Sequence, residues 1–137
     1  MKQQILNYDP SKYRFQEWEC DVLGISGLEH AHASDRVKMM NRSPTSNQLT
    51  STFEDIFENY RRFISDIIIG NIGTIDSQQI PPSFRFHHCG RGSSVFHKGR
   101  DFGVEDGRLN VGVPLTKAWG SNSLRVENQV DAKDLSH

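Results

Sequence analysis

Residues 51–70, STFEDIFENYRRFISDIIIG, form the most clearly patterned stretch of the chain. Their apolar side chains recur every three or four positions, which is the spacing of one face of an α-helix. These side chains are Phe53, Ile56, Phe57, Tyr60, Phe63, Ile64, Ile67 and Ile68. Ser51 and Glu54 have the spacing of a capping box, and Gly70 is a natural helix end. The pattern predicts a helix over 51–70 whose apolar stripe packs as core against a large flat surface such as a sheet.

The residues before this helix are less clearly patterned. Residues 11–23 contain aromatic and aliphatic side chains whose order fits a short helix poorly and a strand only in part. Residues 26–40 look helical, and residues 43–47, SPTSN, have the composition of a loop. We therefore expect residues 1–70 to form a mainly helical region.

The character of the chain changes after Gly70. Residues 71–82 read as a connection, and short β-prone runs follow at 83–89, 93–97, 108–114 and 123–127. Seven of the eleven glycines lie between residues 90 and 120, where they separate these runs. Helices followed by short strands with glycine turns predict an α+β fold, with antiparallel β-strands over 83–127. Four strands are too few to close a barrel, so this is either a small open-sheet domain or an incomplete fold, and we expect the second.

Length and charge limit the classes of function. The 137 residues suit a single domain, 1–137, and 16 basic against 17 acidic residues give a net charge of −1. A nearly neutral chain has no overall field that attracts nucleic acid or an anionic membrane. No signal peptide and no membrane-spanning run is evident, which predicts a soluble cytoplasmic protein. Cys20 and Cys89 lack the spacing of a metal site and are predicted to be free thiols.

A histidine near a carboxylate is the most informative polar pattern. His97 lies at the end of a predicted strand, and Asp101 follows on a turn that contains glycine. Non-haem iron oxygenases begin their facial triad of two histidines and one carboxylate in this way. The usual spacing would place the carboxylate at Gly99, so Asp101 is the nearest acidic candidate. His87 and His88 lie on the preceding predicted strand, and one of them could form a metal site with His97. A structural position in the core or at its rim is at least as good an interpretation of these two histidines.

Residues 96–127 carry a resemblance to a known family. The run FHKGRDFGVEDGRLNVGVPLTKAWGSNSLRVE resembles the StrG-like family, named for a protein of streptomycin biosynthesis. Members of that family resemble cupins and iron(II)/2-oxoglutarate-dependent oxygenases of the phytanoyl-CoA hydroxylase type. The resemblance implies a double-stranded β-helix, which is a cupin or jelly-roll fold. It also implies that this chain holds the helical N-terminal part and the first half of the barrel.

The resemblance also implies roles for single residues. His97 and Asp101 would hold iron(II), with 2-oxoglutarate as co-substrate, and Asn110 would face the pocket. Arg85 would meet a carboxylate or phosphate of the substrate, although a surface arginine is an equally good interpretation. Such enzymes carry a second histidine and a co-substrate arginine on later strands. No arginine follows Arg125 here, and the only later histidine is His137.

Three functions therefore stay open at this point. The first is an oxygenase-like protein that hydroxylates a small metabolite and is inactive or incomplete as this short chain. The second is a non-catalytic cupin-like module that binds a small molecule. The third is an interaction protein that completes its open sheet edge with a partner or a second copy of itself.

Overall fold

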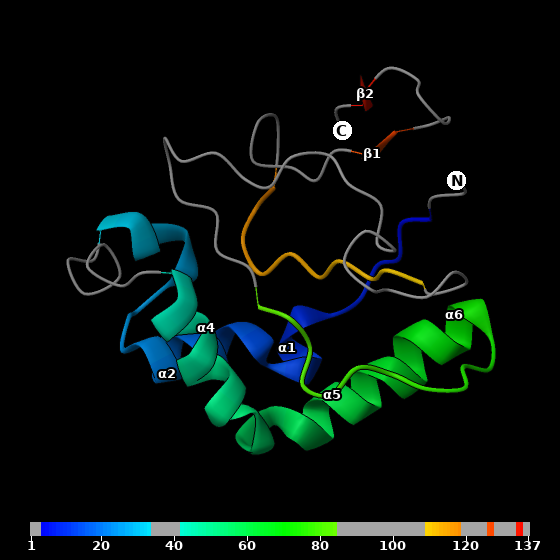
Figure 1. The fold of residues 1–137 in the computed structure, drawn as a ribbon, viewed down its shortest axis with the longest axis horizontal. Helices are drawn as coiled ribbons and strands as arrows, with labels where there is room; N and C mark the ends of the chain where they lie inside the picture. Colours follow the sequence, from blue (N-terminus) through cyan, green and yellow to red (C-terminus); the bar gives the residue numbers. More distant parts are fainter. Residues whose placement is uncertain (1–3, 34–41, 85–108, 119–125, 128–133, 136–137) are drawn as a thin grey trace.

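The computed structural model of the chain describes residues 4–33, 42–84, 109–118, 126–127 and 134–135. The elements, in chain order, are α1 Pro10–Tyr13, α2 Phe15–Leu23, the 3₁₀-helix η1 Leu28–Ala33, α4 Arg42–Ser51, the 3₁₀-helix η2 Phe53–Ile56, α5 Phe57–Phe63, the π-helix η3 Ile64–Ile69, α6 Gly70–Ile72, β1 Val126–Glu127 and β2 Asp134–Leu135. Figure 1 shows the helices gathered on one side of the molecule, with the extended segment 109–118 running across them.

Two short helices begin the chain, and local chemistry defines both. The Asp9 carboxylate accepts a hydrogen bond from the Ser11 backbone N–H at 3.0 Å, and Pro10 occupies the first helical position of α1. Arg14 has a φ of 56°, in the left-handed region, and separates α1 from α2. Gly24, with a φ of 67°, ends α2. This left-handed break explains why residues 11–23 match neither one continuous helix nor a strand.

The helical run predicted over 51–70 is present but has different ends. It covers η2, α5, η3 and α6 without interruption. The predicted capping box is wrong, because Ser51 belongs to α4 and its hydroxyl donates to the carbonyl of Gln48 at 3.0 Å. The run also continues through Gly70 and ends at Gly73, whose φ of 99° suits glycine.

The apolar stripe of this run is core, as predicted, but its partner is not a sheet. Phe63 is 3% exposed and lies in a cluster of aromatic rings from the N-terminal segment. Its ring centroid lies 5.1 Å from that of Tyr8, 5.4 Å from that of Tyr13 and 5.4 Å from that of Phe15, each in an edge-on arrangement. Val113 of the extended segment packs against the same cluster. Aromatic residues around α1 thus take the place of the expected flat surface.

The predicted loop over 43–47 is wrong, since these residues belong to α4. The end of α4 packs against α2. Leu49 is fully buried, and the Gln48 side-chain amide donates to the carbonyl of Val22 at 3.0 Å. This contact fixes the position of α2 relative to the rest of the helices.

The predicted double-stranded β-helix is also wrong. The described residues are mainly helical, and their only strands are β1 and β2, which pair antiparallel over two residues each. Residues 83–84 and 109–114 form no strand, although they belong to the predicted β-prone runs 83–89 and 108–114. Strand formation requires a neighbouring strand to pair with. Figure 1 shows 109–118 running beside the helices instead, and Val113 of this segment packs against the core cluster. The predicted strands at 85–89 and 93–97 lie outside the described residues.

Candidate functional site

Helix α2 presents two faces of opposite character. Phe15, Glu19 and Leu23 follow one another at four-residue intervals on its inner face, where Leu23 is fully buried and Glu19 is 7% exposed. Glu17 and Asp21 lie on the other side of the helix axis, since each residue advances the helix by about 100°. Both of these carboxylates are exposed. One face therefore holds α2 in place, and the other is open for binding.

A groove runs along the outer face of α2. It has a volume of about 590 Å³, within the ~300–1,000 Å³ typical of small-molecule sites. Helix α2, the turn that follows it, η1 and the extended segment 109–118 form its walls. The lining residues are Gln16, Glu17, Cys20, Asp21, Ile25, Ser26, Gly27, Leu28, Glu29, His30 and Leu115.

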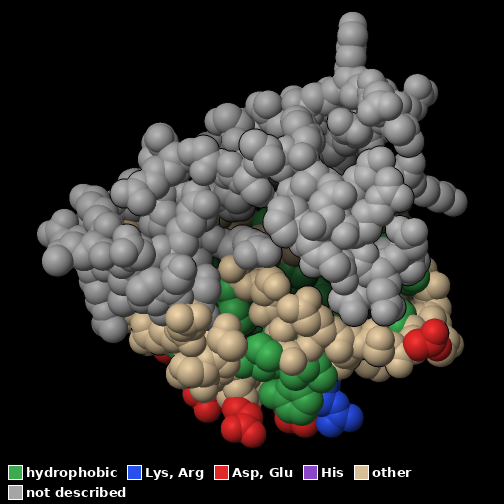
Figure 2. All heavy atoms as spheres, viewed as in Figure 1, with side chains coloured by type: hydrophobic (Ala, Val, Ile, Leu, Met, Phe, Trp, Pro, Cys, Tyr) green, Lys and Arg blue, Asp and Glu red, His purple; other side chains and the backbone are tan. Residues whose placement is uncertain are grey.

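The groove is acidic although the chain as a whole is nearly neutral. Glu17, Asp21 and Glu29 line it, and no lysine or arginine is among the described lining residues. Figure 2 shows that acidic side chains also stand out along the exposed surface of the helical part, next to hydrophobic ones. A cation about 4 Å from one such carboxylate gains roughly 1 kcal/mol in water and more where water is excluded. The lining therefore favours a positively charged, hydrogen-bonding ligand.

Two lining residues hold the extended segment against the groove. The Gln16 side-chain amide donates to the carbonyl of Leu115. The Glu29 carboxylate accepts a hydrogen bond from the backbone N–H of Lys117 at 2.7 Å. Charge-assisted bonds of this kind are among the stronger hydrogen bonds in proteins. Residues 115–117, which lie about a hundred positions from α2 in the sequence, thus become part of the groove.

The groove offers a weak nucleophile. Burial is the main cause that raises the pKa of the Cys20 thiol, and the carboxylates of Glu19, Asp21 and Glu17 raise it further, while a hydrogen bond with the Leu28 backbone opposes them. The thiolate is the reactive form of cysteine, so this environment makes Cys20 inert at neutral pH. This confirms that Cys20 is a free thiol and favours binding over covalent catalysis.

Glu19 is the most unusual titratable group among the described residues. Its carboxyl is buried in the inner face of α2, and burial raises its pKa from 4.5 to about 7. No hydrogen bond or ion pair from any described residue compensates it. The indole N–H of the adjacent Trp18 is also buried without a partner in the described part of the chain. Buried polar groups without partners are uncommon and often have a function.

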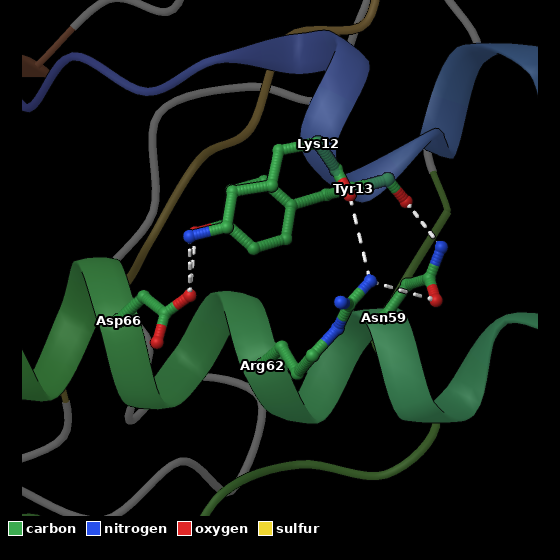
Figure 3. A network of polar contacts seen from close by, with 5 residues as sticks. All are labelled: Lys12, Tyr13, Asn59, Arg62 and Asp66. Atoms are coloured by element: carbon green, nitrogen blue, oxygen red, sulfur yellow. Dashed lines mark hydrogen bonds and ion pairs between the residues drawn. The ribbon is translucent and has the colours of Figure 1, made fainter.

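A second cluster of polar residues connects α1 to the long helical run (Figure 3). The Tyr13 hydroxyl donates to Asp66 at 2.9 Å, and the Lys12 ammonium lies 3.1 Å from the same carboxylate oxygen. Asn59 donates to the Tyr13 carbonyl at 2.8 Å, and Arg62 contacts the Lys12 carbonyl. Burial raises the pKa of the Tyr13 phenol, so that the phenol stays neutral. Because Tyr13 is 1% exposed, this network holds the fold together and does not offer a reactive group to a substrate.

Of the four predicted site residues, the structure describes only Asn110. Asn110 is exposed on the extended segment and is not part of the lining. Arg85, His97 and Asp101 lie outside the described residues. Within the described ranges, no three histidine, cysteine or acidic side chains gather in a way that could hold a metal ion. The iron site and the self-association through a sheet edge therefore stay predictions.

Sequence reasoning missed the groove. One signal was available, since Glu17 and Asp21 are four residues apart and share one face of α2. The contributions of Glu29 and Leu115 depend on the fold. Within the described ranges, no helix has the length and apolarity needed to cross a bilayer.

Comparison with known proteins gives one informative similarity. The chain is similar to the streptomycin biosynthesis protein StrG of Streptomyces griseus, with 29% identity over 128 residues. The match covers 90% of this chain and 64% of the relative, so the chain spans less than two thirds of the relative's length. Neither a family model nor a solved structure matches. The predicted resemblance to StrG is confirmed as a similarity. The predicted likeness to cupins and oxygenases gains no support from it.

Proposed function

We propose that this protein takes part in the biosynthesis of a small metabolite and binds a cationic, hydrogen-bonding intermediate in the groove along α2. The observation that carries the proposal is the lining itself. Among the described residues, three with a carboxylate side chain and none with a basic side chain line a space of about 590 Å³. A small molecule that carries an amine or a guanidine has the charge that such a lining attracts, and the volume is in the range of small-molecule sites.

The groove offers several kinds of contact to such a ligand. Glu17 and Asp21 project from the same face of α2 and can together receive one planar guanidinium group. Ser26 and His30 supply further hydrogen-bonding groups to the lining, and Ile25 and Leu28 supply apolar surface. A mixture of a few polar groups with apolar walls is typical of small-molecule sites.

The similarity to StrG supports the biosynthetic part of the proposal. That relative is named for the biosynthesis of streptomycin. This chain has its own set of acidic lining residues, and the proposal assigns it a ligand class and no particular pathway.

The groove predicts charge-selective binding. We expect 1,4-diguanidinobutane to bind the wild-type protein in isothermal titration calorimetry, because its two permanent cations match the carboxylates of the lining. The replacement Asp21→Asn keeps the shape of the side chain and removes its charge. It should weaken binding about five- to tenfold, which corresponds to roughly 1 kcal/mol for one carboxylate at a partly exposed site.

Two controls define this experiment. The uncharged diurea of the same length should not bind detectably, and Glu58→Gln, an exposed acidic residue of α5 outside the groove, should bind like the wild type. Equal binding of the diguanidine and the diurea would contradict the proposal, as would an unchanged affinity in Asp21→Asn.

The predicted iron site is tested separately. If His97 holds iron(II) beside 2-oxoglutarate, anaerobic addition of both should produce a visible charge-transfer band that is lost in His97→Ala. His30→Ala, which alters the groove instead, should keep the band. A folded wild-type protein that gives no band would remove the oxygenase from consideration and leave the binding function.

A further inference from the structure

The buried Glu19 carboxyl and the groove belong to the same short helix. Gln16, Glu17, Cys20 and Asp21 of α2 line the groove, while Glu19 lies between them in sequence and faces inward. Any movement of α2 away from its support therefore moves four lining residues at once. A group that determines how stably α2 packs on the other helices therefore also determines whether the groove forms.

Helix α2 packs against α4 and against η1. Leu23 of α2 and Leu49 of α4 are both fully buried, and the Gln48 side chain fixes the carbonyl of Val22. Trp18 contacts Phe53 and Phe84 through its ring, with centroids 6.4 Å and 5.7 Å away. This surrounding is apolar, and it would lose stability if a negative charge were placed inside it.

The described charged side chains of the neighbouring elements do not compensate Glu19. On α2 itself, Glu17 and Asp21 point to the other face. Glu29 and His30 of η1 are exposed and line the groove. Glu54 and Asp55 of η2 are exposed. Arg42 lies in the first turn of α4, and its side chain is not among the described ones. None of the described side chains forms an ion pair or hydrogen bond with the Glu19 carboxyl.

We propose that Glu19 is a proton-operated control of the groove: while its carboxyl is neutral, α2 stays seated on α4 and the groove is formed, and loss of the proton unseats α2 and abolishes ligand binding. This inference rests on the proposed function of the groove and adds its regulation. The ligand class is unchanged, a cation recognised by Glu17, Asp21 and Glu29.

The size of the effect follows from the fraction of molecules that are able to bind. Since burial raises the pKa of Glu19 to about 7, about one molecule in eleven keeps the proton at pH 8 and nearly all keep it at pH 6. The apparent dissociation constant is divided by this fraction, so affinity should weaken about tenfold from pH 6 to pH 8. By reciprocity, a bound ligand must make Glu19 hold its proton more tightly.

The direction in which affinity changes with pH distinguishes a movement of α2 from a direct electrostatic effect of Glu19 on the ligand. A negative charge on Glu19 near the groove would attract a cation, so Coulomb's law alone predicts tighter binding as the pH rises. Weaker binding at higher pH therefore requires that α2 changes its position.

The test is calorimetric titration of 1,4-diguanidinobutane at about pH 6, 7 and 8, because guanidinium groups keep their charge throughout this range. Wild-type affinity should fall about tenfold, and Glu19→Gln, with a neutral side chain of the same shape, should bind equally at all three values. Glu54→Gln, an exposed carboxylate outside the groove, should follow the wild type. A profile shared by wild type and Glu19→Gln would overturn the control while leaving the proposed function intact.

A second measurement tests the proposed role of Glu19 in the wild-type protein, in case Glu19→Gln does not fold. The ¹³C resonance of the Glu19 carboxyl reports its protonation in the wild-type protein, with and without a saturating concentration of the diguanidine. The midpoint should move to higher pH with the ligand present. An unmoved midpoint beside clear binding would overturn the control. Absence of binding at pH 6, where the groove is formed, would instead remove the proposed function itself.

Discussion

Phe63→Ala is expected to lower the free energy of unfolding by about 3–5 kcal/mol, a large share of the total stability of a small domain. Phe63 is 3% exposed and contacts three aromatic rings from three places in the N-terminal segment. Its removal leaves a cavity where α1, the start of α2 and the long helical run meet. The measurement is urea unfolding followed by far-ultraviolet circular dichroism.

A matched control is available on the surface. Ile5 is 83% exposed, so Ile5→Ala should change the free energy of unfolding by no more than about 0.5 kcal/mol. A loss below about 1 kcal/mol in Phe63→Ala, or the same loss in both variants, would show that the aromatic cluster does not hold the helices together.

Glu19 is expected to make the protein less stable as the pH rises. Its pKa is raised from 4.5 to about 7 in the folded protein, so the folded state binds the proton more tightly than the unfolded state. Stability from this group is complete below pH 4.5 and is lost as the pH rises to about 7. At about 1.4 kcal/mol per pH unit, wild type should lose roughly 3 kcal/mol over this interval.

Glu19→Gln should remove this loss, because the amide cannot ionise. The variant should therefore be more stable than wild type at about pH 8 and no more stable at about pH 4.5. Measuring both proteins by urea unfolding at each pH isolates Glu19 from all other titratable groups. Parallel curves for the two proteins across this range would contradict the burial of an uncompensated carboxyl.

Carboxylates that accept hydrogen bonds from nearby donors affect the stability of the fold at lower pH than Glu19 does. The ammonium of Lys12 and the hydroxyl of Tyr13 lower the pKa of Asp66, and the hydroxyl and backbone N–H of Ser11 lower that of Asp9. Both groups contribute stability that is lost as the pH falls below their ordinary value of 3.8. Their window lies below that of Glu19, so the two effects do not overlap.

The long helical run could be predicted from the sequence because its signal is local and strong. Phe53, Ile56, Phe63 and Ile68 all fall on one stripe, and all are buried. Its ends could not be predicted in the same way. Ser51 has capping chemistry but is taken up by α4, and Gly70 can end a helix but here continues one. Single residues at helix ends allow several outcomes, and tertiary contacts select among them.

Composition misled the prediction at two places. Residues 43–47 are rich in serine, threonine and asparagine, yet α4 forms there because Leu49 and Gln48 dock its end on α2 and because proline is tolerated in a first helical turn. Residues 109–118 contain alternating valines typical of a strand, yet Val113 packs on the aromatic cluster and Leu115 is held by Gln16. In both cases contacts between distant residues outweighed local preference.

The groove could not be predicted because its charges come from separate elements. Glu17 and Asp21 are related by helical spacing, but Glu29 and Leu115 join them only after α2, η1 and the extended segment are packed. A search for metal-binding spacing drew attention to His97 and Asp101 instead. Burial of Glu19 had no sequence signal, since glutamate is among the residues least often buried without a partner.

The most direct test of the central claim is ¹⁵N nuclear magnetic resonance of the wild-type protein at about pH 6, titrated with 1,4-diguanidinobutane and, separately, with its uncharged diurea. The account predicts saturable shifts, for the diguanidine alone, centred on the backbone amides of Glu17, Asp21 and Glu29. Shifts centred elsewhere, shifts of equal size with the diurea, or no shifts from a folded protein would contradict it.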